Sequence, residues 1–186
     1  MSLSGEDILQ NTGLSSNIMV SNKFMEPQEI QKILLGKFPE DILSFDESSD
    51  ILTLTVKKSR IIDLIKYFKE DLGYRFLTDL CGIHYPDQEL QLGVVYHLHN
   101  LQKNERIRVK TFTSVEAPEI DSLTGIFSAA NWMERETYDF FGVIFTNHPN
   151  LIRILNVEYL DYYPLRKEFP LEDQTRTDKD DRFFGR

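Results

Sequence analysis

The chain has 186 residues and a formal net charge of -9, from 30 acidic and 21 basic side chains. This excess of negative charge argues against a nucleic-acid-binding surface, because it supplies no net positive field for phosphates. The single cysteine, Cys81, excludes an internal disulfide and any zinc or iron–sulfur site whose cysteine ligands come from this protein alone. With 41% hydrophobic residues, the protein is long enough for one domain with a sizeable core.

Targeting and membrane signals are not evident in the sequence. No apolar run approaches the roughly 18–20 residues that a membrane-spanning helix needs. Glu6 and Asp7 come early and no apolar stretch follows them, which is not the pattern of a signal peptide. We therefore expect a cytosolic protein in a reducing compartment, attached to a membrane only through partners.

The N-terminal part of the protein alternates between unpatterned and periodic stretches. Residues 1–25 are rich in Ser and Asn and show no sustained periodicity, so we expect a flexible N-terminal segment. A short amphipathic helix is predicted to begin at Pro27 and to end before Pro39. Two short strands, at 41–45 and 51–56, and a clearer helix at 59–72 follow.

Three longer strands are predicted at 76–85, 90–99 and 105–112, separated by polar turns. The order helix, two strands, helix, three strands predicts an α+β fold, a two-layer α/β sandwich. We expect a mostly antiparallel mixed sheet with both helices on one face. A C-terminal helix at 122–141, a short extended piece at 143–145 and an extended, partner-docking arm at 156–186 complete the prediction, so that residues 26–155 form the domain.

One stretch is unusually dense in both charge and aromatic rings: Ala130-Asn-Trp-Met-Glu-Arg-Glu-Thr-Tyr-Asp-Phe-Phe-Gly142. Continued to Leu155, this run resembles the signature of the 30 kDa-type subunit of respiratory complex I, the proton-pumping NADH:quinone oxidoreductase. Pro164-Leu-Arg-Lys-Glu-Phe-Pro170 resembles the family's second hallmark, and Asp79-Leu-Cys-Gly-Ile-His-Tyr-Pro86 a weaker third. The likeness covers about residues 27 to 171, and the sequence departs from the usual pattern at His84, Ile152 and Glu168.

The resemblance implies a subunit that carries no flavin, cluster or quinone of its own. In such a complex NADH, FMN, iron–sulfur clusters and quinone belong to other subunits. The 30 kDa-type subunit lies in the hydrophilic arm beside the quinone-site subunit, designated D, and the cluster-bearing subunits, designated B and I. The resemblance further implies a hetero-oligomer located peripherally on the cytoplasmic side of the bacterial inner membrane.

No catalytic, cofactor-binding or metal-binding residue is assigned in this sequence. The resemblance and the density of charge instead indicate side chains for structural or partner contacts. These are Trp132, Glu134, Arg135, Glu136, Asp139, Phe141, His148, Arg153, Arg166 and Lys167.

The carboxylates of the dense stretch admit three interpretations. Acid–base catalysis needs two carboxylates set across a substrate, whereas these lie on one helix with Arg135 among them. On a helix Arg135 and Asp139 are i, i+4 partners, and Trp132, Glu136 and Asp139 share a face. We therefore expect either an internal ion-pair network, with Arg153, Arg166 and Lys167 as the basic partners, or pairing with a neighbouring subunit.

Two further groups keep alternatives open. His97 and His99 lie two apart on a strand, a spacing that can chelate zinc, but polar residues on a sheet face are the simpler interpretation. Arg106, Arg108 and Lys110 form either a solvated face or a docking patch. The function expected from the family is a structural subunit that supports the quinone-site and cluster-bearing subunits. The alternatives are the equivalent subunit of a membrane-bound hydrogenase or F420-type dehydrogenase, and a stand-alone metal-dependent enzyme.

Overall fold

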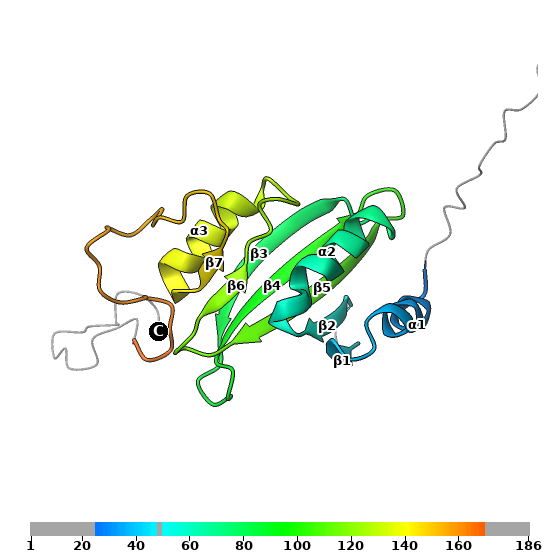
Figure 1. Cartoon of the computed structure of the whole chain (residues 1–186), viewed down its shortest axis with the longest axis horizontal. Coiled ribbons are helices and arrows are strands. Elements are labelled where there is room, and N and C mark those ends of the chain that lie inside the picture. The colour runs from blue at the N-terminus through cyan, green and yellow to red at the C-terminus, as the bar shows by residue number, and fades with distance from the viewer. Residues whose placement is uncertain (1–24, 48–49, 170–186) are drawn as a thin grey trace, which may run out of the picture.

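The computed structural model describes residues 25–47 and 50–169 (Figure 1). The helices are α1 (Pro27–Lys37), α2 (Ile61–Glu70) and α3 (Ala130–Phe141), and a single 3-10 turn, η1 (Lys58–Arg60), leads into α2. The strands are β1 (Ile42–Asp46), β2 (Leu52–Val56), β3 (Phe76–His84), β4 (Leu92–Asn100), β5 (Glu105–Thr113), β6 (Glu119–Asp121) and β7 (Ile144–Thr146). Most of the expected N-terminal segment and the end of the expected arm lie outside the described residues.

Five strands form one mixed sheet in the order β1-β2-β5-β4-β3. Only the β2–β5 pair is parallel, and the other three pairs are antiparallel. The prediction of an α+β fold with a mostly antiparallel mixed sheet is therefore confirmed. Alternation along the strands selects the core face, because side chains two residues apart point the same way. In β4 this face carries four completely buried side chains, Leu92, Val94, Tyr96 and Leu98.

Helix α2 covers the core face of the sheet (Figure 1). Its apolar positions follow the helical period, and all four are completely buried: Ile61, Leu64, Ile65 and Phe68. Each fully buried side chain of this size contributes about 1.5–3 kcal/mol to folding. Helix α1 packs beside α2, with the Phe38 and Tyr67 rings 5.8 Å apart, which agrees with the expectation that both helices lie on one face.

The prediction that the C-terminal helix begins at Ser122 is wrong, because α3 begins at Ala130. The Ser122 hydroxyl accepts a hydrogen bond from the Thr124 amide, and the Leu123 carbonyl accepts from the Ile126 and Phe127 amides. Local bonds of this kind compete with a helical backbone. Residues 119–121 form β6, which pairs in parallel with β7 and was not predicted as a strand.

Candidate functional site

An irregular segment follows β7 and runs beside α3 (Figure 1). We call residues 150–169 the C-terminal segment. Because it has no regular helix or strand, its backbone amides and carbonyls need other partners. Side chains and a carbonyl of α3, with one histidine of β3, supply them. The four groups are those of Arg135, Asp139, Phe140 and His84.

Asp139 is the central group of this contact. It lies on α3 and is completely buried. One carboxylate oxygen accepts hydrogen bonds from the backbone amides of Ile154, Leu155 and Asn156, at 3.1, 2.8 and 2.9 Å. Burial by itself raises the pKa of Asp139, but these amides together with Arg153 outweigh it and hold the pKa well below its usual range.

Arg153 pairs with the other carboxylate oxygen of Asp139 at 2.8 Å, and its side chain is only 9% exposed. The same guanidinium donates to the backbone carbonyls of Leu160 and Tyr162, at 2.8 and 3.3 Å. One arginine therefore ties α3 to two later points of the C-terminal segment. Five donors in a fixed fork make arginine suited to this task, whereas a lysine ammonium would lack the geometry.

The i, i+4 pairing expected between Arg135 and Asp139 does not form, and this corrects the prediction. Arg135 donates instead to the backbone carbonyls of Ile152 and Arg153, at 3.1 and 3.2 Å, and stacks over the Trp132 ring. Trp132, Glu136 and Asp139 lie at i, i+4 and i+7 of the regular helix α3 and so share a side of it, but their surroundings differ along the helix. Trp132 is 61% exposed and Glu136 is exposed, whereas Asp139 is buried. A buried carboxylate surrounded by amide donors has no need of a cation on its own helix.

The C-terminal end of α3 is held by Arg166. Gly142 ends the helix in a left-handed conformation, with φ of 74°. Arg166 donates to the Phe141 carbonyl at 2.7 Å and stacks over the Tyr163 ring at 4.6 Å. Arg166 was expected to pair with a carboxylate of α3, but it caps the helix instead, where a cation also complements the helix dipole.

We expect Gly142→Ala to lower the free energy of unfolding by about 1–3 kcal/mol, the usual cost of holding a non-glycine residue in this region. A Cβ at this position would also lie 2.5 Å from the Tyr163 ring, and therefore the C-terminal segment would have to shift. Urea denaturation of the two proteins measures the difference. Gly125→Ala is the matched control, because a Cβ there meets no atom within 4 Å. Equal effects of the two substitutions would contradict this account of Gly142.

His84 anchors the end of the C-terminal segment. Its side chain is 1% exposed, and Nδ1 accepts a hydrogen bond from the Lys167 amide at 2.9 Å. Nε2, which then carries the hydrogen, has no hydrogen-bond partner among the described residues and lies 3.9 Å from a carboxylate oxygen of Glu168. Lys167 thus acts through its backbone rather than its charge. His84 belongs to the weak third motif, and this motif was the only sequence signal that pointed to it.

Glu134 forms a second buried centre on the other side of α3. Both carboxylate oxygens accept hydrogen bonds at 2.6 Å, one from the Ser122 hydroxyl and one from the Leu123 amide. Burial raises the pKa of Glu134 to about 7, although those two donors partly oppose the shift. His148 lies 4.0 Å away, but its Nδ1 accepts from the Asn150 amide and its Nε2 lies 3.1 Å from the Asn131 carbonyl. Both ring nitrogens of His148 therefore have backbone partners, and neither forms a hydrogen bond with Glu134.

Phe141 completes the contact between α3 and the sheet. Its ring lies over Gly82 of β3. Of the ten side chains assigned to structural or partner contacts, the structure therefore places two in buried carboxylate centres, Asp139 and Glu134, with the others around them or exposed. It does not bring Glu134, Glu136 and Asp139 together. These carboxylates face three different environments, which gives no acid–base pair.

Similarity to known proteins places this arrangement in a family. The profile of the family described as "Respiratory-chain NADH dehydrogenase, 30 Kd subunit" matches residues 54–175. An NADH-quinone oxidoreductase subunit of Citrifermentans bemidjiense is 41% identical over 143 residues, which cover 77% of this chain and 89% of that protein. NADH-ubiquinone oxidoreductase subunit 9 of Reclinomonas americana is 40% identical over 86% of this chain and 78% of that protein. The protein belongs to the 30 kDa subunit family of the respiratory-chain NADH dehydrogenase.

Two solved structures share the fold of this 30 kDa subunit. The trypsin-resistant fragment of Nqo5 superposes with a TM-score of 0.58 at 27% identity, over 66% of this chain and 98% of that one. One polypeptide of an archaeal respiratory membrane complex, the membrane-bound sulfane sulfur reductase, gives a TM-score of 0.66 at 27% identity, over 77% and 85%. Relatives and structural neighbours alike are parts of respiratory assemblies.

The histidines of the 30 kDa subunit are engaged with protein groups. His97 accepts a hydrogen bond from Arg108 at 2.7 Å and lies 3.3 Å from Asp79, while His99 contacts Asn104 at 3.3 Å. Burial, followed by Arg108, lowers the pKa of His97. Over residues 25–47 and 50–169, no group of three His, Cys, Asp or Glu side chains is arranged to hold a metal ion.

The C-terminal segment of the 30 kDa subunit exposes many large apolar side chains. They are Ile152, Leu155, Val157, Tyr159, Tyr162, Leu165 and Phe169, with exposures between 37% and 87%. Trp132 of α3 adds a further exposed ring. Apolar side chains gathered on one segment in this way indicate a protein interface rather than a solvated loop. No helix among the described residues has the length and apolar character required to cross a bilayer.

Proposed function

We propose that this protein is a structural subunit without catalytic residues of its own in the hydrophilic arm of a proton-translocating NADH:quinone oxidoreductase. It supports the quinone-site subunit, D, and the cluster-bearing subunits, B and I, during electron transfer from NADH to quinone. The observation that carries the proposal is the C-terminal segment. It exposes apolar side chains to solvent, and its backbone is hydrogen-bonded to α3 and β3. Its place is peripheral, on the cytoplasmic side of a bacterial inner membrane, with attachment through partners.

These hydrogen bonds explain how a segment without regular secondary structure can act as a rigid interface. Asp139 and Arg153 bind five of its backbone groups, Arg135 binds two more, and His84 binds another at the far end. A segment ordered before association loses less conformational entropy when its partner binds. Exposed Leu155 and Tyr159, at 68% and 87%, are then presented in a defined position.

In this function the redox groups belong to other subunits. One cysteine cannot hold an iron–sulfur cluster, which requires several thiolates or histidines. NADH, FMN, the clusters and quinone would then be bound by the other subunits. This subunit would hold those subunits in position and take no part in the redox reactions.

A related assembly is the second candidate. The archaeal sulfane sulfur reductase contains a polypeptide of the same fold, with a higher TM-score, 0.66, than the Nqo5 fragment. The equivalent subunit of a membrane-bound hydrogenase or F420-type dehydrogenase is the same kind of alternative. Co-purifying subunits decide between them, because flavin- and NADH-binding subunits indicate one assembly and nickel-site subunits another. A stand-alone metal enzyme would instead show stoichiometric metal in the purified protein.

We expect the double substitution of Leu155→Ser and Tyr159→Ser to abolish or strongly reduce co-purification of the other subunits with the tagged protein from its native host. NADH-driven quinone reduction in membranes would fall with it, because the exposed apolar contacts are lost. The isolated variant should unfold at the wild-type temperature, since both side chains are exposed. Leu101→Ser is the control, since Leu101 is 65% exposed but lies in the β4–β5 turn. Full assembly and activity of the double variant would refute the role given to the segment.

A further inference from the structure

The sheet has a second face, which no helix covers among the described residues. Helices α2 and α3 both lie on the core face (Figure 1). On the opposite face the strand register aligns Cys81 of β3, Val95 of β4 and Lys110 of β5 in one row. We call this surface the open face. Its members in β3, β4 and β5 are Asp79, Cys81, Ile83, Val95, His97, Arg106, Arg108, Lys110 and Phe112.

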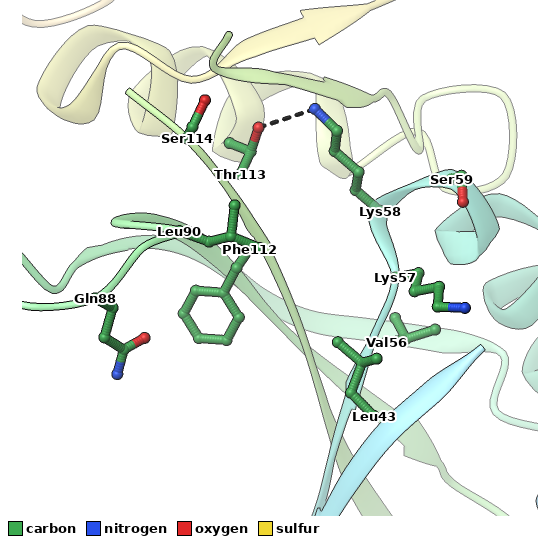
Figure 2. Close-up of a pocket in the computed structure, with 10 residues that line it drawn as sticks. All are labelled: Leu43, Val56, Lys57, Lys58, Ser59, Gln88, Leu90, Phe112, Thr113 and Ser114. Atoms are coloured by element: carbon green, nitrogen blue, oxygen red, sulfur yellow. Dashed lines mark hydrogen bonds between the residues drawn. The ribbon is translucent and has the colours of Figure 1, made fainter. Parts of the chain in front are cut away.

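The open face ends in an apolar pocket of about 510 Å³ beside the end of β5 (Figure 2). Phe112 belongs to both surfaces, and Leu43 of β1 and Leu90 of the β3–β4 loop complete the apolar wall. Leu43 and Leu90 are 57% and 43% exposed, although both are aliphatic. Three large apolar side chains of the described residues thus line one cavity and face its interior.

The wall of this pocket is preformed. The Phe112 ring lies over Gly93, where a Cβ would come within 2.7 Å of the ring. Tyr85 also packs against Phe112, with its ring centroid 6.1 Å from that of Phe112. These two contacts hold the Phe112 ring in place at the wall of the pocket. The cavity is therefore a fixed shape rather than a gap between mobile side chains.

The charge at the rim is positive, in contrast to the protein as a whole. Lys57 and Lys58 are the only charged residues among those that line the pocket, and the loop acids Asp87 and Glu89 are not among them. Lys58 donates to the Thr113 hydroxyl at 3.0 Å (Figure 2), whereas the exposed Lys57 forms no ion pair with any described residue. A lysine beside an exposed apolar wall selects a ligand that carries both an apolar group and a carboxylate.

We propose that this pocket receives a segment of a neighbouring subunit in which an aliphatic or aromatic side chain stands beside an Asp or Glu. The apolar side chain enters between Leu43, Leu90 and Phe112, and the carboxylate pairs with Lys57. A buried apolar anchor with a charged pair at the rim is the usual anatomy of an interface centre. This site is separate from the C-terminal segment, and the inference rests on the proposed function only in requiring a multi-subunit assembly.

The test uses the tagged full-length protein, alone and in the complex purified from its native host. Cys81→Ser removes the single thiol, and Leu43→Cys then places one in the pocket wall. We expect maleimide to label the free protein readily and the complex more than about tenfold more slowly, as for a side chain in a water-excluding interface. Leu101→Cys in the same background is the control for access, because it lies in the β4–β5 turn away from the pocket.

A carbodiimide cross-link identifies the occupant. Lys57 should join a carboxylate of another subunit that has an apolar neighbour in its sequence, and Lys57→Gln should remove that cross-link. Equal labelling of Leu43→Cys in the complex and the free protein would overturn the proposal, as would protection already present in the free protein. A cross-link from Lys57 only to carboxylates of its own polypeptide would also overturn it. Failure of the tagged protein to recover any other subunit would instead contradict the proposed function.

Discussion

Replacing Asp139 by alanine is expected to lower the free energy of unfolding by about 3–5 kcal/mol, the cost of removing one partner from a buried ion pair. The carboxylate is completely buried and accepts five hydrogen bonds, including one from Arg153 at 2.8 Å. Its removal leaves the Arg153 guanidinium and three backbone amides without their acceptor. Because all these donors belong to residues 153–156, the damage should begin in the C-terminal segment rather than in the sheet.

Amide hydrogen exchange measures this difference by region. In Asp139→Ala, the amides of Ile154, Leu155 and Asn156 should exchange much faster than in wild type. The amides of β4 and β5 should lose protection only by the amount that the global free energy of unfolding falls. Glu136→Ala is the matched control on the same helix, because Glu136 is exposed, and should change stability by less than about 0.5 kcal/mol. If Asp139→Ala retained wild-type stability and wild-type exchange rates, the Asp139 carboxylate would not be what holds the C-terminal segment against α3. Co-purification of the other subunits should be lost with the order of the segment.

Replacing Glu134 by glutamine is expected to remove a pH dependence of stability worth up to about 3 kcal/mol, from a shift of the pKa from 4.5 to about 7 at 1.36 kcal/mol per unit. In the unfolded state this carboxyl loses its proton near its ordinary value, whereas in the folded state it retains the proton to about pH 7. Between these values the folded state binds more protons, and stability therefore falls as pH rises. Above pH 7 the loss is complete. Glutamine cannot ionise, so this fall should be absent in the variant.

Urea denaturation of both proteins at steps from pH 4.5 to pH 8 provides the measurement. The quantity compared is the difference in unfolding free energy between the Gln variant and wild type, which should grow in favour of the variant as pH rises. Burial and, to a smaller extent, the Glu134 carboxylate raise the pKa of the Tyr96 hydroxyl, which ionises above the pH range of the measurement. A difference that stays constant with pH would show that Glu134 ionises in the folded state as it does in the unfolded one.

Local patterns were sufficient to predict most of the elements of this fold. Helix α2 was predicted because four apolar positions recur at helical spacing, and β5 because Ile107 and Val109 alternate with Arg106 and Arg108. Both signals come from neighbours in sequence, and both elements expose one side to solvent. The three-residue strand β6 was not predicted, and β7 was predicted only as a short extended piece. Each is stable only by pairing with the other across more than twenty residues.

The residues of the candidate site were also predictable in part from the sequence. Its members could be recognised from the density of charge and aromatic rings on α3 and from the family likeness, but their pairing could not. Helical spacing favoured Arg135 as the partner of Asp139, since i, i+4 neighbours meet on an isolated helix. In the folded protein Arg153 is the partner, because the C-terminal segment returns over the face of α3 that carries Asp139. His84, which anchors the far end of that segment, carries no local signal of its role.

The sequence by itself determined the α+β class, the order of the main elements, the family and the lack of enough cysteines to ligate a cluster. These properties depend on residue types and short spacings, which a linear sequence displays directly. The tertiary structure alone decided which charges meet, since Asp139 is bound by Arg153 and three amides while Glu134 is buried against the Ser122 hydroxyl and the Leu123 amide. Such pairings depend on desolvation and on segments far apart in sequence, and neither is visible until the protein has folded.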